Sequence, residues 1–452
     1  MAKQVHVFTF DGVNTVLDVG SGSLHRVDDL AAAILRLGDL ELPELMPRLA
    51  DRFPAEEIRE VWEEIQILKA EGTLWAEEPA DPGGAPEPVV KSLCLNVAHD
   101  CNLTCDYCFA GQGDFGGARG LMSAAVAKKA LDFLIQSSGS RHNLEVDFFG
   151  GEPLLNLEVV KEALAYGREQ AALHGKEISF TLTTNGLLLT PEIEQFLNDE
   201  GLSLVLSLDG RAETHDRFRR DRGGKGTYER LVPRFQTVVA GRGNTDYYVR
   251  GTYSRFNLDF SRDVAHLWDL GFKEVSVEPV VAGPEAAYAL RPEDLPMLTR
   301  EYESLARELA RRRRAGEDIR FFHFEVEMEE GPCLEKRLKG CGAGVEYLAV
   351  DPAGDLYPCH QFVGQSDLRL GDVEVGLERP DLRKLFSEVR PGVKEDCRDC
   401  WARYHCGGGC HANAYLQEGD LRQPWRLGCE LERKRLELAL YLQVLATEPM
   451  AE

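Results

Sequence analysis

The chain has 452 residues, a net charge of −24 at pH 7 and a pI near 5.0. This length exceeds one ordinary hydrophobic core and predicts two or three domains. The acidic balance argues against a nucleic-acid backbone or an anionic membrane surface as partner. The sequence has no apolar stretch of transmembrane length and no apolar signal region near its start, so we expect a cytoplasmic protein.

Residues 1–78 predict a small separate unit of three short strands followed by three helices. The turn pairs Asp11-Gly12 and Gly20-Ser21 separate the strands. The strands are expected at 5–10, 15–19 and 23–27, and the helices at 29–37, 41–52 and 55–71. Residues 79–90, rich in proline, glycine and acidic side chains, indicate a linker.

From residue 91 to 290 the pattern alternates between strands and helices. Six such repeats favour a parallel sheet curled as a partial (β/α)6 barrel, with its chemistry at the carboxyl ends of the strands. The strands are expected at 92–97, 144–149, 178–183, 204–208, 247–252 and 274–278, and the helices at 124–137, 157–174, 191–199, 228–240 and 258–270. A bridging helix and connector should occupy 291–330, a cysteine-rich region 331–430, and a C-terminal helix 431–452.

Eight of the twelve cysteines lie after residue 330. Clustered cysteines in a large chain without an export signal favour metal ligation in a reducing compartment over disulfides. A second group, the C-x3-C-x2-C run Cys101, Cys105 and Cys108, directly follows the first barrel strand. Three closely spaced thiolates can hold one face of an iron–sulfur cube and leave its fourth iron open. A zinc site, the alternative, normally has four ligands in two pairs.

This cysteine run, with an aromatic residue before its last cysteine, resembles the cluster loop of radical S-adenosylmethionine (SAM) enzymes. In that family the open iron binds SAM, which is cleaved to a deoxyadenosyl radical that takes a hydrogen atom from the substrate. The GGEP, Thr-Asn-Gly and Ser-Leu-Asp-Gly motifs end the next three strands, as they do in the family. The resemblance implies SAM contacts from Tyr107, Gly150, Gly151, Glu152, Pro153, Thr184, Asn185 and Ser207, and from Arg219 or a neighbouring arginine.

The C-terminal cysteine spacing resembles the SPASM extension of radical SAM enzymes, which carries two auxiliary clusters. The resemblance implies a total of three 4Fe-4S clusters. It assigns Cys341, Cys359 and Cys410 to the first auxiliary cluster, with Cys333 as an uncertain fourth ligand, and Cys397, Cys400, Cys406 and Cys429 to the second. A zinc-ribbon-like region with two sites is the alternative, since zinc tolerates similar spacings.

The N-terminal unit resembles the precursor-peptide recognition domains of peptide-modifying enzymes, which have a winged-helix-like order and bind a leader peptide as an added strand. A solubilising cap is the alternative. The segments 19–29, 331–333 and 357–362 are similar to those of maturases of SCIFF peptides, which are short and rich in cysteine. This resemblance implies a thioether bond between a cysteine sulfur and a carbon of the same precursor peptide, with a flavodoxin- or ferredoxin-type electron donor.

Two rival functions remain at this point. Anaerobic sulfatase-maturating enzymes, which form formylglycine, have an acidic proton acceptor after the cysteine that matches Cys359, whereas this chain has His360. His360 is either a general base or a buried, hydrogen-bonded side chain. A non-catalytic iron–sulfur electron carrier or scaffold is the second rival. The sequence does not identify the catalytic residues.

Overall fold

The computed structural model describes residues 4–78, 89–328 and 340–447, so Cys333 and most of the expected linker lie outside the described residues. Eight parallel strands in the order β11-β10-β9-β8-β7-β6-β4-β12 form the centre of the fold. Six of them match the predicted strands within two residues: β4 (Ser92–His99), β6 (Asn143–Gly150), β7 (Glu177–Thr184), β8 (Ser203–Ser207), β9 (Tyr247–Tyr253) and β10 (Glu274–Pro279). The predicted fold class, an α/β fold built on a parallel sheet, is confirmed.

Two short strands widen the sheet beyond the six that we expected. β11 (Arg320–Phe321) pairs with β10, and β12 (Tyr347–Val350) pairs with β4 at the other side. β12 comes from the cysteine-rich region, so that region is joined to the barrel by a continuous sheet. Antiparallel strands complete the sheet: β13 (Asp355–Tyr357), β14 (Gly371–Asp372) and β15 (Gly376–Leu377) beyond β12, and β5 (Gly120–Leu121) beside β4.

Helices connect the parallel strands. Every residue of β4 is buried, as expected for a parallel strand covered on both faces. Ser123 caps the first connecting helix by accepting a hydrogen bond from the backbone of Val126, and Thr190 followed by Pro191 starts the third. The helices are α4 (Ala124–Ser137), α5 (Leu157–Leu173), α6 (Pro191–Asp199), α7 (Ala212–Phe218), α8 (Tyr228–Gly241) and α9 (Phe260–Asp269).

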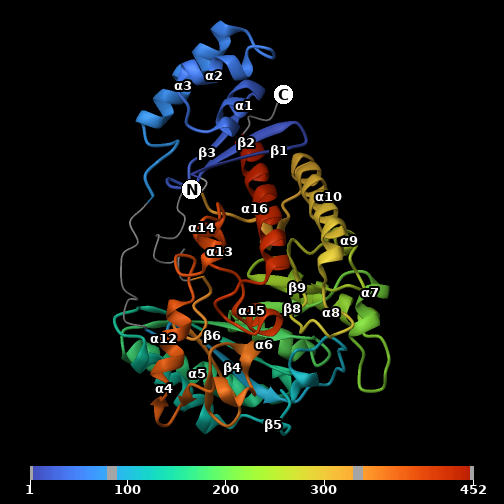
Figure 1. Ribbon diagram of the computed structural model, residues 1–452. Helices are drawn as coiled ribbons and strands as arrows, with labels where there is room; N and C mark the ends of the chain where they lie inside the picture. Colours follow the sequence, from blue (N-terminus) through green and yellow to red (C-terminus); the bar gives the residue numbers. More distant parts are fainter. Residues whose placement is uncertain (1–3, 79–88, 329–339, 448–452) are drawn as a thin grey trace.

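The N-terminal unit has the predicted order, with an antiparallel sheet β1-β2-β3 and three helices. It lies at the top of the molecule, above the long helices α10 (Leu295–Arg314) and α16 (Arg426–Ala446) (Figure 1). β3 forms one edge of the sheet. The elements are β1 (Val5–Phe10), β2 (Val13–Asp18), β3 (Leu24–Val27), α1 (Asp29–Leu37), α2 (Leu42–Leu49) and α3 (Ala55–Ala70).

This unit is less separate than the sequence suggests, because its sheet packs against the body of the protein. Phe10 meets the edge of the Tyr441 ring with 4.9 Å between ring centroids. The ring of His6 stacks on Trp401 at 3.7 Å, and its Nε2 lies 3.1 Å from Glu437. Apolar residues of β1 and β2 therefore belong to the same core as α16.

The C-terminal helix α16 begins at Arg426 instead of residue 431, so the prediction was five residues too short. No proline interrupts residues 426–431, and Gly428 allows close contact, since a Cβ there would lie 2.7 Å from the Trp425 ring. Cys429 thus lies in the first turn of α16. The region before it contains the short helices α12 (Pro380–Glu388), α13 (Glu395–Arg398), α14 (Arg403–Cys406) and α15 (His411–Glu418).

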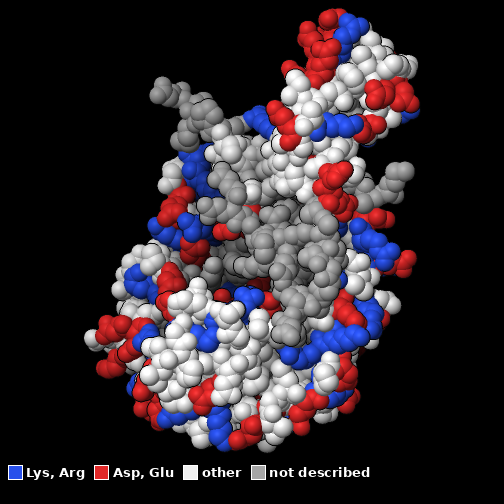
Figure 2. All heavy atoms as spheres, turned by 90° about the vertical axis from the view of Figure 1, so that its left-hand side faces the viewer, with Lys and Arg blue, Asp and Glu red and all other residues white. Residues whose placement is uncertain are grey.

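Among the described residues, no helix is both long and apolar enough to cross a membrane. Acidic and basic side chains are interspersed over the described part of the face shown in Figure 2. This surface therefore lacks the single-sign basic field that attracts nucleic acids.

Candidate active site

The cluster loop 101–108 follows β4 at the edge of the sheet where the carboxyl ends of the parallel strands meet. The sulfur-bearing residues Cys101, Cys105 and Cys108 line one cavity together with residues from β6, β7 and β8. Of the predicted SAM contacts, the structure brings seven to this cavity: Tyr107, Gly150, Gly151, Thr184, Asn185, Ser207 and Arg219. Motifs far apart in the sequence thus meet at one place.

The three cysteines suit a multi-iron cluster. Burial raises the pKa of Cys101 to about 12 and also raises that of Cys105, so these side chains are thiols until a metal displaces their protons. The Cys101 sulfur accepts hydrogen bonds from the Leu103 backbone at 3.4 Å and from Asn185 Nδ2 at 3.6 Å. In the described part of the chain, no three His, Cys, Asp or Glu side chains converge to hold a single metal ion. Three cysteine sulfurs at one cavity are the donor set that one face of an iron–sulfur cube requires.

Gly150 and Gly151 let the end of β6 touch the cluster loop. A Cβ at Gly151 would lie 2.1 Å from the carbonyl oxygen of Asp100. Gly150 has φ +121°, and a Cβ there would lie 2.4 Å from the Ala98 carbonyl oxygen. A side chain at Gly150 would push β6 away from the end of β4, and one at Gly151 would push it away from Asp100, which directly precedes the cluster loop.

Glu152 is buried where the ends of β6 and β7 meet. Its carboxylate is fully buried and accepts hydrogen bonds from the Thr184 hydroxyl and the Asn185 backbone, both at 2.8 Å. Burial outweighs these bonds and raises the pKa of Glu152 to about 7. Neither Glu152 nor Pro153 is among the described residues that line the cavity. Glu152 therefore joins the ends of β6 and β7 and orients Asn185, which contacts Cys101.

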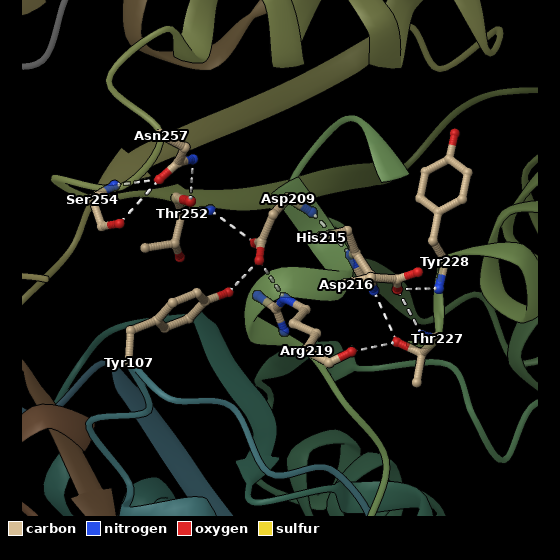
Figure 3. A network of polar contacts seen from close by, with 10 residues as sticks. All are labelled: Tyr107, Asp209, His215, Asp216, Arg219, Thr227, Tyr228, Thr252, Ser254 and Asn257. Atoms are coloured by element: carbon tan, nitrogen blue, oxygen red, sulfur yellow. Dashed lines mark hydrogen bonds and ion pairs between the residues drawn. The ribbon is translucent and has the colours of Figure 1, made fainter. Parts of the chain in front are cut away.

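Asp209, which the sequence did not single out, is the centre of the network in Figure 3. Its Oδ2 accepts from the Tyr107 hydroxyl at 2.5 Å and from Arg219 Nε at 3.0 Å, and its Oδ1 accepts from the Thr252 backbone at 3.0 Å. The Arg219 guanidinium lies 5.6 Å from the centroid of the Tyr107 ring. Asp209 thus connects the cluster loop, α7 and β9. Its place in the Ser-Leu-Asp-Gly motif, of which only Ser207 was predicted to contact SAM, was the available sequence signal.

His215 holds the backbone of Asp209 in place. Its Nδ1 accepts a hydrogen bond from the Asp209 backbone at 3.3 Å, so Nε2 carries the proton and donates to the Thr227 hydroxyl at 2.9 Å. Thr227 in turn donates to the carbonyl oxygen of Arg219 at 2.9 Å. This chain of bonds fixes the neutral tautomer, and burial lowers the pKa of His215 to about 4.

We expect His215 to make stability fall in mild acid. Between pH 6.5 and 4 the unfolded chain binds a proton at His215 that the folded chain excludes, so unfolding becomes easier as pH decreases. The contribution is about 3 kcal/mol at full effect. The measurement is denaturant unfolding from pH 7 to pH 4. In His215→Asn, whose amide oxygen can replace Nδ1 as acceptor, stability should be lower at pH 7 and fall less steeply. Parallel pH profiles for the two proteins would contradict this assignment.

The C-terminal cysteines form two groups. Burial is the main cause that raises the pKa of the Cys359 thiol. Cys341 and Cys410 are close enough to raise it further by charge repulsion. The other four, Cys397, Cys400, Cys406 and Cys429, line one cavity between α13, α14 and the start of α16. This is the division that the SPASM resemblance implies, except that Cys333 lies outside the described residues. The second group offers four sulfur donors around a space, as an iron–sulfur cluster requires.

His360 is a hydrogen-bonded side chain in the structure. Its Nδ1 lies 2.9 Å from the Tyr347 hydroxyl, and its ring lies 5.5 Å from that of Phe109 and 5.2 Å from that of Phe149. Burial and the nearby Arg250 lower the pKa of His360 to about 4. The imidazole is therefore neutral near pH 7, and it packs against two aromatic residues that line the cavity.

Comparison with known proteins identifies the core. Residues 95–240 match the model of the radical SAM superfamily. This segment includes the cluster loop and the ends of β6, β7 and β8. The chain is a radical SAM enzyme. Enzymes of this superfamily bind a 4Fe-4S cluster and SAM, and the cavity of this enzyme contains the three cysteines that such a cluster requires.

Three similar proteins extend the comparison. The serine-type anaerobic sulfatase-maturating enzyme of Bacteroides thetaiotaomicron is 24% identical over 362 residues, 71% of this chain and 82% of that protein. The structure of anSMEcpe with bound AdoMet matches 80% of this chain and 96% of that one, with a TM-score of 0.67 and 20% identity. Streptococcus suis SuiB bound to its precursor peptide SuiA matches 91% of this chain and 95% of that one, with a TM-score of 0.51 and 15% identity.

Proposed function

We propose that this radical SAM enzyme is a peptide maturase that forms an intramolecular thioether between a cysteine sulfur and a carbon of another residue in a ribosomally made precursor peptide. The observation that carries the proposal is the N-terminal unit, whose sheet has β3 at one edge and packs on α16, the helix that holds Cys429. An exposed strand edge can pair with a leader peptide. The unit therefore offers a peptide-binding element fixed to the catalytic body.

The match to SuiB supports this reading of the N-terminal unit. Residues 79–452 are 374 of 452 residues, or 83% of the chain, so a 91% match must extend into residues 1–78. The matched protein is described as bound to a precursor peptide, SuiA. We infer that the present enzyme also recognises a precursor peptide with a leader, in a reducing cytoplasm, and receives electrons from a flavodoxin- or ferredoxin-type donor.

We assign three 4Fe-4S clusters to the cysteine groups. The first would be held by Cys101, Cys105 and Cys108, and the two auxiliary clusters by the two C-terminal groups, with Cys333 as an optional fourth ligand of the group around Cys359. When bound with SAM, the first cluster supplies the reductive cleavage that produces a hydrogen-abstracting deoxyadenosyl radical. We also retain the proposed domain ranges 1–78, 91–290 and 331–430, with the C-terminal helix now starting at residue 426.

The enzyme's own residues hold the cluster loop and the cavity wall in place. Asn185, held by Glu152, supports the cluster loop through Cys101. Asp209 holds Tyr107 and Arg219 on the cavity wall. In the overall reaction an S–H and a C–H bond break and an S–C bond forms. One hydrogen atom goes to deoxyadenosine, the other leaves as a proton, methionine is released from SAM, and the initiating electron is returned, so no external oxidant is needed.

Formylglycine formation is the second candidate, favoured by the similarity to sulfatase-maturating enzymes. It requires a proton acceptor beside the substrate cysteine, and the family resemblance places an acidic residue at position 360. Here His360 is bonded to Tyr347 and close to the positive charge of Arg250. Both features oppose uptake of a proton, which favours the thioether reaction. A carrier without catalysis is disfavoured because it needs no SAM cavity.

The test uses anaerobically reconstituted enzyme, SAM, dithionite and the cysteine-rich peptide encoded beside its gene. We expect deoxyadenosine together with a loss of two hydrogens for each cysteine that no longer reacts with iodoacetamide, measured by mass spectrometry. An aldehyde at the cysteine would establish the formylglycine reaction instead. Deoxyadenosine with an unchanged peptide would refute this peptide as substrate, and no deoxyadenosine would favour the carrier.

A further inference from the structure

The cavity has a second wall that the predicted SAM contacts do not explain. It consists of residues from the ends of β9 and β10 and from the loop after Cys359: Arg250, Thr252, Glu278, Pro279, Val280, Val281 and Gln361. This wall lies close to the first auxiliary cysteine group, because Gln361 is two residues after Cys359. Desolvation is the main cause that raises the pKa of the Cys410 thiol, and the negative charge of nearby Glu278 raises it further.

Arg250 is held on this wall by Glu278. The Arg250 NH2 group donates to Glu278 Oε2 at 2.5 Å. Burial alone would raise the pKa of Glu278, but the guanidinium outweighs burial and lowers it to about 2, so the pair is ionised at any working pH. Within the described part of the chain, Glu278 is the side chain that pairs with Arg250. The side chain of Arg250 is 37% exposed, which leaves further N–H donors available to a ligand in the cavity.

A series of hydrogen bonds through buried Ser276 and half-buried His323 and Arg435 also holds Glu278. Arg435 on α16 lies 3.3 Å from His323 Nδ1, and since arginine only donates, His323 must carry its proton on Nε2. That nitrogen lies 3.4 Å from the Ser276 hydroxyl, which lies 3.4 Å from Glu278 Oε1. The direction of donation therefore runs from α16 toward Glu278. This arrangement makes Glu278 a fixed acceptor that positions Arg250, rather than a proton carrier.

Gln361 supplies the complementary group. Its Oε1 is buried and has no hydrogen-bond partner among the described residues, while its Nε2 lies 3.5 Å from His360 Nε2. A buried amide oxygen without a partner is costly, which indicates that a ligand satisfies it. Burial lowers the pKa of His360, and the positive charge of Arg250 lowers it further. Arg250 therefore lies near His360, the residue that precedes Gln361.

We propose that Arg250 and Gln361 clamp one peptide unit of the substrate backbone between the SAM cavity and Cys359, with Arg250 donating to its carbonyl oxygen and Gln361 Oε1 accepting from its N–H. The clamp rests on the proposed peptide-maturase function and adds the residues that position the substrate. The Arg250–Glu278 pair is neutral overall, which suits a neutral amide. A carboxylate, such as that of SAM, offers no proton to Gln361 and would oppose its oxygen.

The test compares Arg250→Gln, Arg250→Lys, Gln361→Leu and Gln361→Glu with the wild type, all reconstituted under nitrogen. The probe is a fluorescein-labelled form of the cysteine-rich peptide encoded beside the gene. We expect the Kd for the peptide, by fluorescence anisotropy, and its KM in thioether formation to rise roughly 10- to 100-fold in Arg250→Gln and Gln361→Leu. The peptide Kd and KM should rise less in Arg250→Lys, which keeps a donor, and in Gln361→Glu, which keeps an acceptor. The Kd for SAM and the iron content should match those of the wild type.

Arg369→Gln is the matched control, since Arg369 is 34% exposed and paired with Asp355 but lies outside the cavity. It should leave the peptide Kd and KM unchanged. Wild-type peptide affinity in both Arg250→Gln and Gln361→Leu would overturn the clamp, and so would an equal rise in the Kd for SAM. If the wild type binds the peptide but forms no thioether, the proposed reaction is wrong. The peptide Kd values of the variants still test whether Arg250 and Gln361 clamp the peptide.

Discussion

Replacing Cys101, Cys105 and Cys108 together by alanine is expected to remove one iron–sulfur cluster and abolish SAM cleavage. These three cysteines line the SAM cavity, Cys397, Cys400, Cys406 and Cys429 line another one, and none of the described C-terminal cysteines lines the first. The variant should therefore lose about four irons and four sulfides per chain and retain the rest. Iron and sulfide analysis of anaerobically reconstituted protein measures the loss, and chromatography measures deoxyadenosine.

Cys94→Ala is the matched control. Cys94 is a buried cysteine of β4, only 1% exposed, and packs in an apolar cluster with Phe115 and Tyr357. The control should keep the iron content and deoxyadenosine yield of the wild type. A triple variant that retains full iron and still cleaves SAM would show that the radical cluster is held elsewhere.

Substituting Asp209 by asparagine is expected to lower the free energy of unfolding by about 3 kcal/mol or more, because it leaves the Arg219 guanidinium buried without a counter-charge. The same change weakens the hydrogen bonds that hold Tyr107 and the end of β9. We therefore also expect weaker SAM binding. Anaerobic denaturant titration measures the first effect, and equilibrium dialysis with radiolabelled SAM measures the second.

Two further variants separate the ion pair from the loss of a tyrosine contact. Asp132→Asn weakens a similar bond, in which Tyr166 of α5 donates to Asp132 of α4 at 2.8 Å without an arginine. It should cost less than about 1 kcal/mol. The double variant Asp209→Asn/Arg219→Gln should recover part of the stability, with a coupling energy of at least about 1 kcal/mol. Additive effects of the two single changes would refute the pairing as the cause.

Much of the fold follows from local patterns. Alternation of apolar strands with amphipathic helices predicts six strands of the sheet within two residues, and the turn pairs of the first 28 residues predict the N-terminal sheet. The two-residue strand β11 and the four-residue strand β12 escape such a prediction, because short strands carry too few residues to show a period. Their pairing depends on neighbours that are distant in the sequence.

The sequence by itself determined the chemistry of the first site, because the spacing of Cys101, Cys105 and Cys108 places three sulfurs in one loop, and glycines permit β6 to reach it. Only the tertiary structure decided what the charged residues do. Tyr107 and Asp209 are 102 positions apart, and His323 and Arg435 are 112 apart, yet both pairs are in contact. A carboxylate or guanidinium has no preferred local partner, so its role is set by the buried groups that folding brings to it.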